Sequence, residues 1–140
     1  MTTILSDAHL GVMVADSSVS DGDRVWSERK VFRIKGALIG LAGEDGDCGR
    51  FLQWVKDGLP GKPRFGETAA LILTPGQLLF FDGNYVEPVK VKSGREAIGS
   101  GGKSAMCAYE ALGWTDPRRA VRIVCRHDAA SRAPVRVYMV

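Results

Sequence analysis

Two short stretches near the start of the chain carry apolar residues at both odd and even positions. They are the predicted strands 3–7 and 10–16, and the second contains Leu-Gly-Val-Met-Val-Ala-Asp. Side chains alternate between the two faces of a strand, so such a run places apolar side chains on both faces. A sheet built from these strands must be covered on both sides. The chain is therefore restricted to a layered architecture.

Turn and cap signals predict the remaining elements. Lys35-Gly36 and Pro75-Gly76 are expected to close two hairpins, whereas the Ser-, Asp- and Gly-rich residues 17–24 are expected to form a loop. The further predicted strands are 30–35, 37–42, 68–74, 77–82, 85–91 and 134–139. Helices are predicted over about 47–57, 103–112 and 117–127. This order predicts one domain over residues 1–140 with a layered α+β fold.

The composition excludes several classes of protein. The chain of 140 residues has 19 Lys and Arg against 16 Asp and Glu, a net charge of +3, without a basic run, so no nucleic-acid partner is expected. No apolar stretch reaches the length of about 18 residues that a membrane span needs. The first ten residues lack a signal-peptide pattern. The three cysteines are widely spaced, which favours a reducing compartment and predicts a cytoplasmic location without a zinc site.

Thr2 is the first residue in the chain that could act as a catalytic group. Removal of Met1 would expose an N-terminal threonine, which holds a nucleophile and a base in one residue. Its hydroxyl can attack a carbonyl carbon while its own α-amine, with an ordinary pKa of about 7.7–8.0, accepts the proton. The alternative is that Thr2 is an ordinary second residue.

Two charged residues continue apolar strand faces. Asp16 ends the second predicted strand on the face of Val12 and Val14, and Lys30 begins the next strand on the face of Phe32. A buried carboxylate or ammonium is costly unless it is paired, so we expect these two side chains to pair. Lys30 would then lower the pKa of the Thr2 hydroxyl, and Asp16 would hold Lys30 in place. The alternative is a solvated charge at each strand end.

Six segments resemble the proteasome β-type peptidases, which are N-terminal threonine hydrolases, and especially the HslV-type ring peptidase. They occur in the order of that family and are residues 2–6 (TTILS), 11–17 (GVMVADS), 28–33 (ERKVFR), 41–47 (LAGEDGD), 97–102 (AIGSGG) and 127–131 (HDAAS). The resemblance implies a four-layer αββα sandwich.

The resemblance also implies roles for individual residues. Thr2 would be the nucleophile, Lys30 would tune its pKa, Asp16 would orient Lys30, and the Gly43 amide would bind the oxyanion. Two further sets are the hydrogen-bonding group beside the Thr2 amine and the substrate pocket. The first comprises Ser100, Asp128 and Ser131, and the second comprises Val19, Phe32, Leu41 and Asp45.

The chain departs from the family pattern in one helical layer. The family places two long helices between the oxyanion turn and the next strand pair, but here one predicted helix and a Pro- and Gly-containing connector occupy that interval. We therefore expect one truncated helical layer, on a face that the family uses for ring assembly and partner contacts.

The implied function is a self-assembling threonine endopeptidase that hydrolyses unfolded polypeptides in a homo-oligomeric ring. No metal or organic cofactor is expected, and an ATP-dependent unfoldase is a candidate partner. Two alternatives stay open. One is a catalytically silent ring or scaffold protein, which the shortened helical layer favours. The other is an amidohydrolase that uses the same N-terminal chemistry on small amides.

Overall fold

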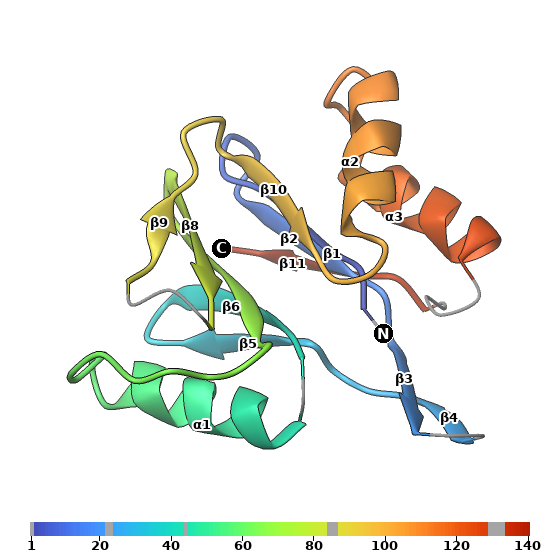
Figure 1. The fold of residues 1–140 in the computed structure, drawn as a ribbon. Helices are drawn as coiled ribbons and strands as arrows, with labels where there is room; N and C mark the ends of the chain where they lie inside the picture. Colours follow the sequence, from blue (N-terminus) through green and yellow to red (C-terminus); the bar gives the residue numbers. More distant parts are fainter. Residues whose placement is uncertain (1, 22–23, 44, 84–86, 129–133) are drawn as a thin grey trace.

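Two antiparallel sheets face each other in the computed structural model, which describes residues 2–21, 24–43, 45–83, 87–128 and 134–140 (Figure 1). The four-stranded sheet has the order β10 (Arg95–Ile98), β1 (Ile4–Asp7), β2 (Val12–Ala15) and β11 (Arg136–Met139). The five-stranded sheet has the order β5 (Val31–Ile34), β6 (Ala37–Ala42), β7 (Ala69–Thr74), β8 (Gln77–Asp82) and β9 (Val89–Lys90).

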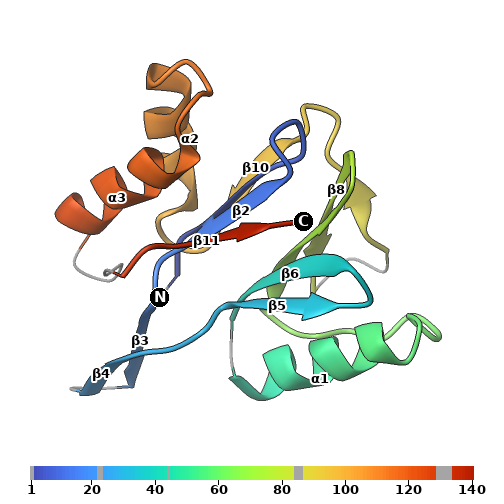
Figure 2. The same ribbon diagram turned by 180° about the vertical axis from the view of Figure 1, so that it is seen from behind.

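Helices cover the outer faces of both sheets. The helix α1 (Asp45–Lys56) packs on the five-stranded sheet, while α2 (Gly102–Ala111) and α3 (Pro117–His127) pack on the four-stranded sheet (Figure 2). The result is the predicted αββα sandwich, with a single helix in one outer layer. None of the helices in the described part of the chain is long and apolar enough to cross a membrane.

Strand alternation divides the core into three layers. In β2, Met13 and Ala15 enter the cluster between the sheets, whereas Val12 and Val14 face α2 and α3. All four residues of β1 and of β2 are buried, as expected for a sheet covered on both sides. Both apolar faces that the sequence predicted for these strands are therefore buried.

The sheets approach closely at Gly40 in β6. A Cβ atom at this position would lie 2.9 Å from Cγ2 of Ile4 and 2.9 Å from Sδ of Met13, both on the opposite sheet. Real Cβ atoms essentially never lie this close to another atom, so a larger side chain would require Ile4 and Met13 to shift within the packed layer between the sheets. Gly40 therefore sets the local spacing between the sheets.

Aromatic packing attaches the single helix α1. The ring centroid of Phe51 lies 5.5 Å from that of Trp54 and 5.0 Å from that of Phe81 on β8. The indole Nε1 of Trp54 donates to the carbonyl of Pro60 at 2.9 Å, in the segment that follows the helix. Edge-on and tilted aromatic pairs of this kind add about 0.5–1.5 kcal/mol each beyond the area they bury. One short helix can therefore cover its sheet without the second helix of the family pattern.

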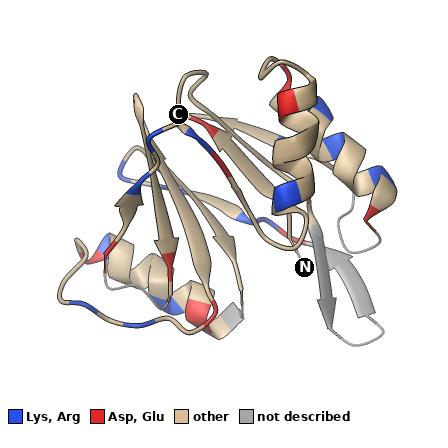
Figure 3. Cartoon of the chain, turned by 45° about the horizontal axis from the view of Figure 1, so that its top comes forward, with Lys and Arg blue, Asp and Glu red and all other residues tan. Residues whose placement is uncertain are grey.

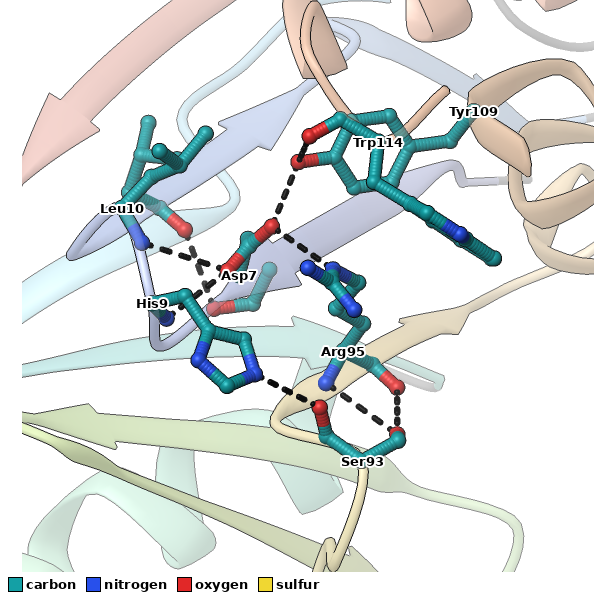
Figure 4. A network of polar contacts seen from close by, with 9 residues as sticks. Asp7, His9, Leu10, Ser93, Arg95, Tyr109 and Trp114 are labelled. Atoms are coloured by element: carbon teal, nitrogen blue, oxygen red, sulfur yellow. Dashed lines mark hydrogen bonds and ion pairs between the residues drawn. The ribbon is translucent and has the colours of Figure 1, made fainter. Parts of the chain in front are cut away.

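A buried carboxylate ties the β1–β2 hairpin to α2 (Figure 4). Asp7 Oδ1 accepts the backbone amides of His9 at 2.8 Å and Leu10 at 3.2 Å. Its Oδ2 accepts the Tyr109 hydroxyl at 2.5 Å and Arg95 Nε at 3.1 Å. Burial opposes the charge of Asp7, but the hydrogen bonds from Tyr109 and the two amides outweigh this effect and lower the pKa of Asp7.

One element contradicts the sequence prediction. Residues 17–24 were expected to form a loop, but β3 (Ser18–Asp21) and β4 (Arg24–Ser27) form a two-stranded antiparallel sheet. Figure 1 shows this hairpin extending away from the two larger sheets. The prediction was wrong because Ser, Asp and Gly are depleted in strands only on average, whereas ladder hydrogen bonds use the backbone.

The Asp7 network predicts a pH-dependent stability. A carboxylate whose pKa is lower in the folded state stabilises the fold above its unfolded pKa of about 3.9, and this stabilisation is lost as the pH falls through the folded pKa. Asp7→Asn should therefore lower the free energy of unfolding near neutral pH and flatten its decline in acid. Urea unfolding followed by circular dichroism across this pH range measures both effects.

Glu110→Gln is the matched control, because Glu110 is an exposed carboxylate on the helix that carries Tyr109. This variant should follow the wild-type pH curve. A decline in Asp7→Asn as steep as that of the wild type would contradict the role given to Asp7.

Candidate functional site

The candidate site begins where the chain enters β1. The Thr3 amide donates to Asp16 Oδ1 at 2.9 Å, and the Asp16 amide donates to the Thr3 carbonyl at 3.1 Å. These bonds extend the β1–β2 ladder by one position and place Asp16 beside the residue that follows Thr2. Thr3 is fully buried, while Thr2 is partly accessible.

Asp16 forms a buried ion pair with Lys30. Lys30 Nζ lies 2.9 Å from Asp16 Oδ1, and the two side chains are 6% and 0% exposed. The pairing expected from two charges on apolar strand faces is therefore present. Burial of a pair costs desolvation, so the geometry and the additional hydrogen bond from the Thr3 amide have to compensate. The catalytic roles of both residues stay predictions.

The environment of Lys30 changes its proton affinity. Burial lowers the pKa of the Lys30 ammonium, and the hydrogen bond and charge of Asp16 oppose this shift without cancelling it. A lysine with a lowered pKa releases its proton more easily than one in water. Such a group suits a site in which protons move between neighbouring atoms.

The glycine-rich loop 99–102 packs on the start of the chain. A Cβ atom on Gly99 would lie 1.9 Å from the Thr2 carbonyl oxygen, and one on Gly101 would lie 2.0 Å from Thr3 Oγ1. The Gly101 amide also donates to the Thr2 carbonyl at 3.3 Å. Ser100, the predicted site residue between the two glycines, is exposed. Only glycine permits this approach, so the loop positions Thr2 through its backbone.

The end of α3 contributes a residue that sequence reasoning missed. Burial raises the pKa of Cys125 to about 11, the charges of Asp16 and Asp128 raise it too, and Lys30 lowers it. Cys125 therefore lies within electrostatic reach of the ion pair and of Asp128. From the sequence, Cys125 was expected only to be one of three widely spaced thiols without a role in a metal site. The sequence feature that could have pointed to Cys125 is its position about one helical turn before Asp128.

Gly43 follows β6 on the five-stranded sheet. Its φ is +147°, and a Cβ atom would lie 2.8 Å from Cα of Thr68. The position therefore requires glycine, and α1 begins two residues later at Asp45. On the same sheet, the Leu41 amide donates to the Lys30 carbonyl at 3.1 Å, which places the ends of β5 and β6 together. The oxyanion role of Gly43 stays a prediction.

The predicted substrate residues occupy different surroundings. Leu41 is buried in the cluster beneath α1, and Phe32 packs partly exposed against the same cluster. Val19 belongs to β3 and Asp45 is the first residue of α1. Ser131 lies outside the described residues. The substrate pocket thus stays a prediction at all four positions, as does the place of Ser131 in the hydrogen-bonding group.

The arrangement supplies groups for acyl transfer. A buried cation, a carboxylate that holds it and a glycine-lined chain start lie together at one end of the sandwich. Among the described residues, no group of three or more His, Cys, Asp or Glu side chains could hold a metal ion.

Comparison with solved structures assigns the chain to a known fold. No protein-family model and no curated protein sequence matches the chain. Eukaryotic HslV from Trypanosoma brucei matches with a TM-score of 0.71 and 26% identity, over 99% of this chain and 100% of that chain. Thiobacillus denitrificans BPH matches with a TM-score of 0.74 and 15% identity, over 99% and 96% of the two chains. Its complex with epoxomicin matches with a TM-score of 0.73 and 15% identity, over 99% and 98%. The chain therefore has the HslV/proteasome-type fold, which confirms the α+β class and the resemblance at the level of the fold.

A double-mutant cycle tests the energetic role of the buried pair. Asp16→Asn and Lys30→Met should each lower the free energy of unfolding by about 3–5 kcal/mol, because each removes one charge of the ion pair and leaves the opposite charge buried. The double variant should lose less than the sum of the two losses. Urea unfolding measures all four corners of the cycle.

The exposed pair Lys62–Glu87, at 3.1 Å and with side chains 66% and 70% exposed, is the control for this cycle. Lys62→Gln should change the free energy of unfolding by less than about 1 kcal/mol. Additive losses at Asp16 and Lys30 would show that the two groups do not stabilise each other.

Proposed function

We propose that this chain is a threonine-type endopeptidase, in which Thr2 becomes the N-terminal nucleophile after removal of Met1. The observation that carries the proposal is the buried Asp16–Lys30 pair, bonded to the Thr3 amide directly beside Thr2. A buried pair costs desolvation and contributes little net stability, so its presence beside Thr2 favours a chemical role.

The proposed reaction uses one residue as both nucleophile and base. The Thr2 hydroxyl attacks the scissile carbonyl carbon, and its proton passes to the Thr2 α-amine. The tetrahedral intermediate collapses with cleavage of the C–N bond, and the ammonium returns the proton to the leaving amine. A water molecule then attacks the ester, gives a proton to the α-amine and releases the acid. The ammonium finally returns a proton to the Thr2 oxygen.

Three features of the chain support charge stabilisation in this scheme. The positive charge of Lys30 would favour the developing alkoxide of Thr2, and Asp16 would fix the position of Lys30. The Gly43 amide would donate to the oxyanion, a contribution typically worth about 3–4 kcal/mol. The N-terminus of α1, two residues further on, would favour negative charge at the same place.

The remaining predicted residues complete the proposal. Ser100 and Asp128, with Ser131, would form hydrogen bonds that orient the Thr2 amine. Substrate side chains would contact Val19, Phe32, Leu41 and Asp45. No cofactor takes part in this chemistry. The substrates would be unfolded polypeptides in the cytosol, cleaved within a homo-oligomeric ring, with an ATP-dependent unfoldase as a candidate partner.

Intact-mass measurement with an epoxyketone tests the nucleophile. This reagent offers a ketone carbon and an epoxide carbon, which can react with the hydroxyl and the amine of one N-terminal threonine. We expect the wild-type protein to lack Met1 and to gain a single adduct. Thr2→Ala should gain none and should lose hydrolysis of a fluorogenic peptide by about 10³-fold or more.

Thr2→Ser is the matched variant, because serine keeps a hydroxyl and a free α-amine after Met1 removal. It should retain the adduct and measurable hydrolysis. The free energy of unfolding of both variants should stay within about 0.5 kcal/mol of the wild type. Retained Met1 without an adduct, or equal hydrolysis by Thr2→Ala, would contradict the proposal and favour a silent ring protein. Hydrolysis limited to small amides would favour the amidohydrolase alternative.

A further inference from the structure

A cavity of about 360 Å³ lies between α3 and the segment that enters β11. Arg118, Arg122, Cys125 and Arg126 line it from α3, and Pro134 and Val135 line it from the other side. We call this the α3–β11 groove. Its volume is in the range of protein ligand sites, which starts at about 300 Å³.

One wall of the groove is a row of arginines. Arg118, Arg122 and Arg126 are spaced four residues apart, so they share one side of α3 and span about 12 Å along it. All three are exposed, and Figure 3 shows the basic bands along this helix. Across the described ranges, no ion pair involves any of the three. Three like charges held side by side favour an anionic partner.

The apolar face of β11 continues the groove. Val137 pairs in register with Val14, and Met139 pairs with Val12. Val12 and Val14 are buried under α2 and α3, so Val137 and Met139 lie on the same outer face of the sheet. Yet these two side chains are 42% and 58% exposed, because α2 and α3 cover β1, β2 and β10 and stop short of β11. A valine and a methionine this exposed on one strand face form an apolar strip beside the arginine row.

We propose that the α3–β11 groove binds an acidic amphipathic segment of a partner polypeptide. Carboxylates spaced one helical turn apart would match the arginine row, since guanidinium groups bind carboxylates in a bidentate manner. Apolar side chains of the same segment would cover Val137 and Met139. The described residues that line the groove include no Asp or Glu, so a second copy docked through the same surface by two-fold symmetry would offer no carboxylates to the arginine row. A small anion would leave the apolar strip exposed.

One residue that lines the groove lies within electrostatic reach of the candidate site. Cys125 lines the groove, and the charges of Lys30 and Asp16 act on its thiol. The docking proposal does not require the chain to be a peptidase, because it rests on the groove alone.

Fluorescence anisotropy with a designed peptide tests the proposal on the full chain. The probe is a fluorescein-labelled helical peptide with glutamate at every fourth position and leucine along the adjacent stripe. The control peptide carries lysine at the glutamate positions. We expect the acidic peptide to bind with a Kd in the micromolar range, at least about tenfold tighter than the control. Its affinity should weaken as salt is raised.

Two sets of variants separate the groove from general positive charge. Arg118→Gln/Arg122→Gln/Arg126→Gln should weaken binding about tenfold or more, and Val137→Ser/Met139→Ser should weaken it about threefold or more. Arg119→Gln/Lys90→Gln/Lys92→Gln removes the same charge at exposed positions that do not line the groove. This control should bind within about twofold of the wild type.

The proposal is overturned if the acidic peptide does not bind below about 1 mM, or if both triple variants bind it equally. It is also overturned if the lysine peptide binds as tightly. Loss of assembly in the groove variants, seen by mass photometry without peptide binding to the wild type, would assign the groove to contacts between copies instead.

Discussion

The Asp16–Lys30 ion pair is the interaction on which the arrangement of this molecule depends. Asp16 follows β2 of the four-stranded sheet and Lys30 precedes β5 of the five-stranded sheet, so the pair joins the two sheets at the end where the chain begins. Its third partner is the amide of Thr3. Since both side chains are nearly inaccessible to water, neither can be lost without leaving a buried charge. The same contact that joins the sheets therefore also positions the first residues of the chain.

Small residues make this arrangement possible. Gly40 lets the two sheets approach, and Gly99 and Gly101 let a loop lie directly on the backbone of Thr2 and Thr3. In each case the missing side chain allows one backbone to reach what another element presents. The candidate site is consequently built from main-chain contacts around one charged pair, and its geometry depends on packing throughout the sandwich.

The two outer layers are covered to different extents. On one side a single helix, α1, suffices because Phe51 and Trp54 join an aromatic cluster with Phe65 and Phe81. On the other side two helices cover three strands and leave the outer face of β11 accessible. Incomplete covering of an edge strand leaves apolar surface for an interaction, and the arginines of α3 give that surface a preference for negative charge.

The sequence alone determined the features that follow from local chemistry. Two-faced apolar runs required a doubly covered sheet, Lys35-Gly36 and Pro75-Gly76 marked hairpins, and Asp116-Pro117 marked the start of α3, where the Asp116 side chain accepts the Arg119 amide at 3.0 Å. Charges on apolar strand faces likewise predicted the Asp16–Lys30 pair. Other features depend on contacts between segments distant in the sequence, which local propensity does not predict. Only the tertiary structure paired β3 with β4, placed Cys125 within electrostatic reach of the ion pair and left Val137 and Met139 uncovered, because each outcome depends on which element packs against which.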